Sequence, residues 1–219
     1  MINIVKVIGH SDHDTTNNIK ERELSCLSLI YDRSRIKKTN SSYYVLLSEM
    51  RKFKMNIVLL EPEIPANTGN IGRTCVATGT RLHLIEPLGF RLDEKEIRRA
   101  GLDYWKDLDV TVYKNYQDFL DKNTGAKIFM ATTKAQHSYT QVQYDPDCYI
   151  MFGKESAGIP EELLLKNKQN TVRIPMVGDI RSLNLGNSVA IILYEALRQN
   201  NFEGMRMEGQ LHRHSWDEV

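Results

Sequence analysis

Three polar segments of this chain carry the side chains that could do chemistry, and each follows a short apolar run. The first reads Glu61-Pro-Glu-Ile-Pro-Ala-Asn-Thr-Gly-Asn-Ile-Gly-Arg73. Its two prolines stiffen the approach, and Asn67-Thr68-Gly69 is expected to open a helix whose first turn offers free amide donors. Arg73 would project one turn into that helix. Asn67 could equally be only a helix cap, and Arg73 could be a surface or capping cation.

Known phosphate-binding patterns do not account for this first segment. A dinucleotide-binding fold would show GxGxxG, and a P-loop would show GxxxxGK[ST]. Neither pattern is present in the chain. Both phosphate-binding interpretations are therefore weak.

The second and third polar segments also look like binding loops. In Met151–Pro160, the glycines at 153 and 158 suggest that the backbone approaches a flat ligand closely, because only glycine leaves that space. Glu155 is the polar handle of this segment. Ile174–Ser188 joins a strand to the last helix through a long polar stretch, and such loops are more often sites than connectors.

The elements that must position these loops follow from hydrophobic periodicity. Continuous apolar runs predict strands buried on both faces at Asn56–Leu60, Leu82–Ile85, Val110–Tyr113, Lys127–Ala131, Tyr149–Phe152 and Val172–Ile174. Helical periodicity predicts helices at Asn70–Thr78, Glu94–Ala100, Tyr116–Lys122, Glu161–Lys168 and about Gly186–Gln199. This alternation predicts the α/β class: a mostly parallel sheet with helices on both faces. Ligands of such sheets bind outside the carboxyl ends of the strands.

Composition narrows the class of protein. The chain has 219 residues, 41% of them hydrophobic, and it lacks a secretory leader or an apolar run of the roughly 18 residues that a membrane span needs. We therefore expect a cytoplasmic protein with no membrane association. Its three cysteines are far apart with no CxxC pair, which argues against disulfides and a structural zinc site. We expect them to be buried small hydrophobic residues.

Charge and pattern divide the chain into three parts. Residues 1–54 carry a net charge of +4 and show no repeated apolar pattern, so we expect a poorly organised extension, with Met50 or Met55 as a possible start of the natural protein. Residues 55–203 form the organised domain. The net charge over 55–219 is −3, so a polyanion would be bound only through a local basic patch. Residues 204–219 look like a polar tail.

The three segments, in this order, resemble the SPOUT superfamily of RNA methyltransferases. The motifs NTGNIGR, FGKES and RSLNLGNS carry the resemblance, together with RLHLIEPLGF, RRAGLDY and YEALR. The match over about Met55–Phe202 is close enough to name the tRNA (cytidine/uridine-34) 2′-O-methyltransferase branch. The resemblance implies methyl transfer from S-adenosylmethionine to the ribose 2′-hydroxyl of the wobble nucleotide of tRNA, a C-terminal trefoil knot and a homodimer.

The resemblance also implies roles for individual residues. Ala131, Gly153, Ile174 and Ser182 would bind the methyl donor. Arg73 would contact the RNA backbone and stabilise the developing alkoxide, and Tyr194 would lie near the site, although it could instead be a core aromatic. Asn67, Glu155 and Asn184 would shape the substrate pocket. No metal is needed. Basic side chains in matched or adjacent loops would supply the RNA-binding patch: Arg91, Arg98, Arg99, Lys106, Lys134 and Lys154.

Two alternatives stay open at this point. The same reaction could act on ribosomal RNA, although such relatives usually add an N-terminal RNA-binding domain, for which residues 1–54 look too short and disorganised. The chain could also be a catalytically silent RNA-binding or assembly protein with the same fold. Intact Arg73 and a complete third loop argue against that second alternative.

Overall fold

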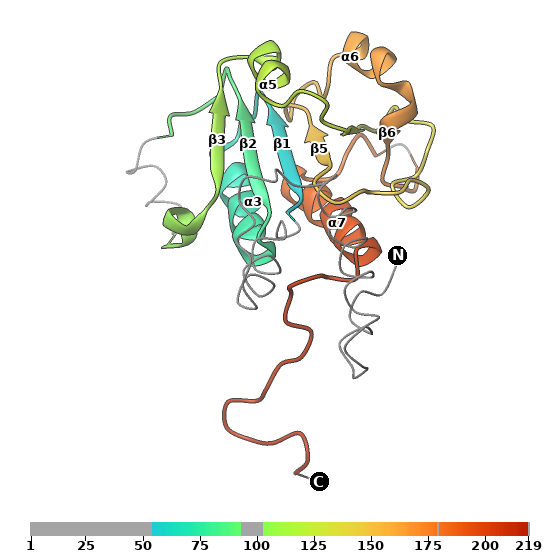
Figure 1. The fold of residues 1–219 in the computed structure, drawn as a ribbon. Coiled ribbons are helices and arrows are strands. Elements are labelled where there is room, and N and C mark those ends of the chain that lie inside the picture. The colour runs from blue at the N-terminus through green and yellow to red at the C-terminus, as the bar shows by residue number, and fades with distance from the viewer. Residues whose placement is uncertain (1–53, 93–102, 179, 219) are drawn as a thin grey trace, which may run out of the picture. The chain divides into compact units, whose positions relative to one another are not determined.

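The computed structural model describes residues 54–92, 103–178 and 180–218, all within the unit Arg51–Val219. Six parallel strands form one sheet in the order β3-β2-β1-β5-β4-β6 (Figure 1). The strands are β1 (Asn56–Leu60), β2 (Arg81–Ile85), β3 (Val110–Tyr113), β4 (Ile128–Ala131), β5 (Tyr149–Phe152) and β6 (Thr171–Val172). β1, β3 and β5 have the predicted bounds, β2 and β4 differ by one residue at the start, and β6 starts one residue earlier and ends two residues earlier than predicted. The parallel sheet confirms the predicted fold class.

Helices connect most of the strands. They are α3 (Pro65–Thr78), the 3₁₀ helix η3 (Asp103–Asp107), α5 (Tyr116–Lys122), α6 (Glu161–Lys166), the 3₁₀ helix η4 (Lys168–Asn170) and α7 (Leu185–Gln199). The prediction is correct for α5 and one residue short at the start of α7. It is wrong at the end of α6, where the chain tightens into η4 after Asn167. The predicted helix Glu94–Ala100 lies outside the described residues.

α3 begins five residues before its predicted start. Pro65 occupies the first turn, where its fixed φ is already helical and its missing N–H leaves nothing unpaired. Asn67 and Thr68 therefore lie inside the helix, and the cap predicted there is wrong, because the N-cap is Ile64. The earlier start also places Arg73 in the third turn instead of one turn from the N-terminus.

Each face of the sheet is covered by two α-helices. On one face, α3 and α7 pack on the strands through a buried cluster that includes Ile71 and Leu193. On the other face, α5 and α6 pack through a second cluster that includes Phe119 and Leu164. This arrangement confirms helices on both faces of the sheet. Both clusters reach the central strand β1, whose five residues are all buried.

The edge strand β3 departs from the prediction of strands buried on both faces. Thr111 and Val112 are exposed, with 41% of Val112 accessible to solvent. Only β2 pairs with β3, so the edge strand lacks a second neighbour to cover its side chains. The apolar run there predicted a strand correctly but overestimated its burial.

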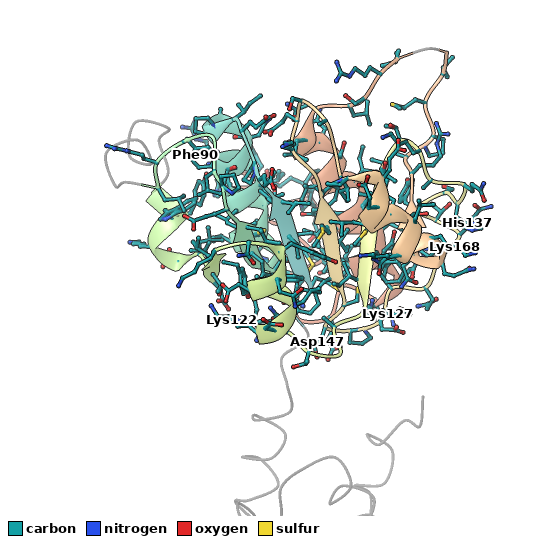
Figure 2. The ribbon with its side chains drawn as sticks, turned by 90° about the horizontal axis from the view of Figure 1, so that it is seen from above. Phe90, Lys122, Lys127, His137, Asp147 and Lys168 are labelled. Atoms are coloured by element: carbon teal, nitrogen blue, oxygen red, sulfur yellow. The ribbon has the colours of Figure 1, made fainter. Side chains whose placement is uncertain are left out.

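The order of the strands reverses between β1 and β5. From β1 the chain adds β2 and β3 on one side, and it then returns to build β4, β5 and β6 on the other. Seen from above, Phe90, which follows β2, lies on one side of the molecule, and His137 and Lys168 lie on the opposite side (Figure 2). In open α/β sheets, ligands bind outside the carboxyl ends of the strands at such a reversal. The loops after β1 and β5 meet at this point.

Two of the three cysteines lie within the described residues, and Cys26 lies outside them. Cys75 and Cys148 are buried free thiols, and burial raises the pKa of each to about 12, which fits the predicted role as small hydrophobic residues. Residues 204–218 form no helix or strand, and Figure 1 shows this segment running away from the sheet. Within the described residues, no helix is long and apolar enough to cross a membrane. The division at residues 54 and 203 stays a prediction.

Candidate active site

A cavity of about 630 Å³ opens at the carboxyl ends of β4, β5 and β6. Seven of the nine residues predicted for the site line it: Asn67, Ala131, Gly153, Glu155, Ile174, Ser182 and Asn184. They come from the start of α3, the end of β4, the loop after β5 and the long segment before α7. Arg73 and Tyr194, the two predicted catalytic residues, do not line this cavity.

The cavity has an apolar wall and a polar border. The wall includes four buried side chains, Phe152, Ile159, Val172 and Ile192. Its remaining border carries hydroxyl, amide and charged groups from the three loops and from the segment after β4, where Thr132, Thr133 and Lys134 line the cavity. A volume of this size, with an apolar lining and a few convergent polar groups, is typical of sites for small organic ligands.

A chain of hydrogen bonds joins the three loops beside the cavity. The side-chain amide of Asn67 donates to Oε1 of Glu155 over 2.9 Å, and the amide of Asn184 donates to Oδ1 of Asn67 over 3.0 Å. Glu155 also accepts the backbone N–H groups of Glu63 and Ile64, at 2.8 and 3.3 Å. From the sequence, Glu155 was expected to offer its carboxylate to the ligand. The structure shows that its carboxylate is engaged by three donors of the protein.

The loops after β1 and β5 are tied together by a second set of contacts. Glu63 accepts two hydrogen bonds of 2.8 Å from Ser156, one from its backbone N–H and one from its hydroxyl. These bonds, the side-chain one first, lower the pKa of Glu63. Lys154 pairs with Glu61 at 2.8 Å across the same two loops. Arg181 donates a bond of 2.6 Å to the carbonyl of Ser156, which brings the third loop against the second.

Gly153 is needed for a different reason from the one predicted. A Cβ at this position would lie 2.1 Å from the carbonyl carbon of Gly158 and 2.3 Å from the nitrogen of Ile159. The loop folds back here, with the N–H of Gly158 donating to the carbonyl of Lys154 over 2.8 Å. The close approach that excludes a side chain is therefore made by the protein's own backbone, although Gly153 also lines the cavity.

Arg73 and Tyr194 lie on the exposed sides of two helices that contact each other, α3 and α7. The exposed fraction of Tyr194 is 45%, so the alternative that it is a core aromatic is wrong. The guanidinium carbon of Arg73 lies 5.6 Å from the centre of the Tyr104 ring. Within the described residues, this ring is the only partner of the Arg73 side chain.

Comparison with known proteins places this site in a family. Residues 54–194 match the sequence profile of the SpoU rRNA Methylase family, which is more than half of the chain. The chain belongs to the SpoU rRNA methylase family. Membership of this family implies that the C-terminal part of the fold is a trefoil knot. Strand and helix patterns could not have predicted the knot, because true knots are very rare among folds.

Individual members of the SpoU family are similar over the same region. The tRNA (cytidine(34)-2′-O)-methyltransferase of Escherichia coli is 48% identical over 151 residues, which cover 68% of this chain and 96% of that protein. A solved structure described under 2′-OH methylation of C/U34 on tRNA is 41% identical, with a TM-score of 0.64. The match covers 68% of this chain and 98% of that one.

A third similar protein is an rRNA methyltransferase of Sinorhizobium meliloti, solved with AdoMet bound. It is 26% identical with a TM-score of 0.60, and the match covers 68% of this chain but 57% of that one. As for metals, the described part of this SpoU chain has no cluster of three or more His, Cys, Asp or Glu side chains that could hold an ion.

The basic patch predicted from the sequence is less available than its residue types suggest. Lys134 pairs with Glu161 at 2.6 Å, and Lys154 pairs with Glu61. Arg91 and Lys106 are exposed, whereas Arg98 and Arg99 lie outside the described residues. The described loops therefore present fewer unpaired basic side chains than predicted.

Two residues that contact predicted site residues or loops were not predicted from the sequence: Arg181, which lines the cavity, and Tyr104, which contacts Arg73. Arg181 joins the second and third loops through its bond to Ser156. Its position as the first residue of the RSLNLGNS motif could have marked it as part of the site. Tyr104 lies under Arg73, and it also belongs to a quoted motif, RRAGLDY. Both were missed because their partners are distant in the chain, so spacing alone does not reveal them.

Proposed function

We propose that this chain transfers a methyl group from S-adenosylmethionine to the ribose 2′-hydroxyl of nucleotide 34 of tRNA, a cytidine or a uridine. The observation that carries the proposal is the convergence of three separate loops on one cavity. Seven residues assigned to the site from the sequence lie on its lining. Relatives with about half of their residues identical carry this activity in their names.

The cavity fits the methyl donor. Its volume of about 630 Å³ lies within the range of small-molecule sites, and its apolar wall suits the adenine ring. We assign donor binding to Ala131, Gly153, Ile174 and Ser182. When bound, the donor supplies a sulfonium methyl group, and these residues orient it and keep water away.

Arg73 is our candidate for activating the acceptor. A ribose 2′-hydroxyl is a poor nucleophile, so the reaction needs alignment and a group that stabilises the developing alkoxide. A guanidinium stays cationic and presents a planar set of donors that matches a phosphate and a neighbouring oxygen. For Tyr194, we propose a place beside the bound RNA.

Arg73 and Tyr194 lie outside the cavity, and this placement supports a homodimer as the active form. Both residues are exposed on α3 and α7 and lie outside the cavity of their own chain. We propose that a second copy of the chain docks on this surface and that Arg73 of one copy acts at the cavity of the other. Isologous contacts of this kind are the common way to build a dimer. Sedimentation analysis of the full chain tests this part of the proposal.

The degree of similarity favours tRNA over ribosomal RNA as the substrate. Identity is 48% to the tRNA methyltransferase of Escherichia coli and 41% to the C/U34 structure, but only 26% to the rRNA methyltransferase. Because tRNA is modified in the cytoplasm of bacteria, we expect the protein to act there. The remaining alternative, a silent RNA-binding protein, predicts no methyl transfer at all.

The deciding experiment is methylation of bulk tRNA and of ribosomal RNA with labelled S-adenosylmethionine, followed by nucleoside analysis. We expect label in 2′-O-methylcytidine or 2′-O-methyluridine from position 34 of tRNA and none in ribosomal RNA. Ile174→Arg places a charged chain on the cavity wall and should abolish labelling. Leu165→Arg, on the exposed side of α6, is the matched control and should label normally. Label only in ribosomal RNA would overturn the choice of substrate.

A further inference from the structure

The 3₁₀ helix η3 lies against the middle of α3, and three contacts define its place. The hydroxyl of Tyr104 donates a hydrogen bond of 2.7 Å to the backbone carbonyl of Gly69. Trp105 and Leu108 lie over Gly72, where a Cβ would come within 3.3 and 3.2 Å of them. η3 therefore packs against the side of α3 that carries Gly69 and Gly72.

Tyr104 contacts Arg73 by its ring as well as α3 by its hydroxyl. The guanidinium carbon lies 5.6 Å from the ring centre, within the distance at which a cation is attracted to an aromatic face. In an α-helix, the carbonyl of residue 69 also accepts the N–H of residue 73. The hydroxyl thus holds the ring on the turn from which Arg73 projects.

The side chain of Arg73 has few other restraints. It is exposed, and within the described residues its guanidinium makes no hydrogen bond or ion pair. A long side chain in solvent samples many rotamers, so a cation that must meet one oxygen atom benefits from a surface that limits them. Tyr104 supplies that surface, and its hydroxyl, hydrogen-bonded to the carbonyl of Gly69, fixes the position of the ring.

We propose that Tyr104 is a positioning residue that holds the guanidinium of Arg73 in the orientation used for methyl transfer, through its ring above the helix and its hydroxyl on Gly69. The inference rests on the proposed function, because it says that the contact between Tyr104 and Arg73 affects the rate of methyl transfer. The contact itself does not depend on that function.

The kinetic test compares Tyr104→Leu, Tyr104→Phe, Arg73→Ala and the Arg73→Ala/Tyr104→Leu double variant under single-turnover conditions. Tyr104→Leu should slow methyl transfer about tenfold with donor affinity unchanged, in line with loss of a cation–π contact. Tyr104→Phe keeps the ring and should lose about threefold or less. The double variant should be no slower than Arg73→Ala, because Tyr104 acts only through Arg73.

Tyr116→Leu is the matched control, since Tyr116 packs on Phe119 on the opposite face of the sheet. Melting temperature and donor affinity are measured for every variant. Tyr116→Leu can affect the rate only through general loss of structure. If Tyr104→Leu likewise loses rate, donor affinity and melting temperature in parallel, Tyr104 is merely structural and the proposal is overturned. An extra tenfold loss in the double variant would also overturn it, because Tyr104 would then act independently of Arg73.

A measurement that needs no activity separates this proposal from the proposed function. In NMR spectra of ¹⁵N-arginine protein, the Arg73 side-chain protons should be shifted upfield by the ring in the wild type and in Tyr104→Phe. The shift should vanish in Tyr104→Leu. Absence of the shift in the wild type overturns the positioning role even if the enzyme is active. If the upfield shift is present in the wild type but Arg73→Ala is fully active, the catalytic role of Arg73 is overturned instead. The kinetic consequence proposed for Tyr104 is then overturned with it.

Discussion

The side-chain amide of Asn67 donates a hydrogen bond of 2.9 Å to Glu155, a residue 88 positions further along the chain. The bond crosses the reversal between β1 and β5 and fixes the start of α3 to the loop after β5. Asn184 extends the same chain of bonds to the third loop. Two loops of the cavity are thus held to α3 by one asparagine.

Glu155→Gln should weaken donor binding and lower the melting temperature together. The glutamine amide would face two backbone N–H groups and the Asn67 amide with one acceptor oxygen instead of two. Leaving a donor unsatisfied costs about 1–3 kcal/mol, which corresponds to a decrease of several degrees for a domain of this size. Titration calorimetry and thermal melts measure both effects. Glu162→Gln, exposed on α6, should change neither, and the prediction fails if the two variants behave alike.

Arg73→Ala should lower the single-turnover rate of methyl transfer by a factor on the order of 100. Donor affinity should stay the same, because donor binding is assigned to Ala131, Gly153, Ile174 and Ser182, which line the cavity, and Arg73 is assigned to the acceptor. Arg73→Lys should restore the rate only in part, since an ammonium group cannot reproduce the planar fork of the guanidinium. Chemistry at the wild-type rate in Arg73→Ala would exclude a catalytic role for this residue.

Gly153→Ala should damage the fold of the second loop as well as donor binding. The added Cβ would meet the carbonyl carbon of Gly158 at 2.1 Å, and a clash with backbone cannot be relieved by rotating a side chain. We expect a loss of roughly 1–3 kcal/mol or more in the free energy of unfolding. Gly209→Ala is the control, because nothing lies within 4 Å of its Cβ position. Lost donor affinity at an unchanged melting temperature would favour direct obstruction of the ligand.

The buried histidine His83 makes stability depend on pH. Its Nε2 lies 3.2 Å from Oδ1 of Asn56 and its Nδ1 2.9 Å from the hydroxyl of Tyr113. Burial lowers its pKa from 6.5 to about 4. In the unfolded chain the imidazole binds a proton below about pH 6.5, whereas in the folded chain it stays neutral down to about pH 4. The free energy of unfolding therefore decreases as the pH is lowered from about 6.5 to about 4.

The loss attributable to His83 should approach about 3 kcal/mol by pH 4. Urea unfolding between pH 7.5 and 4 measures it, with His83→Gln compared at each pH. The variant should be less stable at neutral pH but show a smaller decrease on acidification. His137→Gln, at an exposed histidine, should keep the full decrease of the wild type. Equal pH slopes in the wild type and His83→Gln would contradict the assignment.

Two buried tyrosines should respond in opposite ways to loss of their hydroxyl groups. Among the residues that the structure describes, the hydroxyl of Tyr144 has no hydrogen-bond partner, so Tyr144→Phe should leave stability unchanged or increase it by up to about 1–2 kcal/mol. The hydroxyl of Tyr113 contacts His83 and Asn123, so Tyr113→Phe should decrease stability by about 1–3 kcal/mol. Differential scanning calorimetry of both variants measures this. A destabilised Tyr144→Phe would reveal a partner for that hydroxyl.

Local signals in the sequence predicted most of the elements well. α5 has its predicted bounds because Asn115 caps it through the N–H of Asp118, an interaction within four residues. The apolar stripe of α7 predicted its buried face, including Val189 and Leu193. At α3 the start was wrong, although Pro65 was visible in the sequence, because Asn67 and Thr68 looked like caps.

The candidate site was predicted by residue type but only partly by role. Patterns and the family resemblance selected seven residues that do line one cavity. They assigned Glu155 and Gly153 to a ligand, whereas the carboxylate of Glu155 is held by protein donors and Gly153 makes room for the backbone of Gly158. Neither partner could be read from the chain, because each is chosen by how the loops fold against one another.

The sequence by itself determined the strands, most of the helices and the set of residues available to the site, since these depend on neighbours within a few positions. The tertiary structure decided which of those residues meet. The parallel sheet reverses its order at β1 and β5, and this brings Asn67 to Glu155 and Lys154 to Glu61 across about 90 positions of chain. It likewise leaves Arg73 outside the cavity and beside Tyr104, because helical geometry directs its side chain away from the sheet and toward η3.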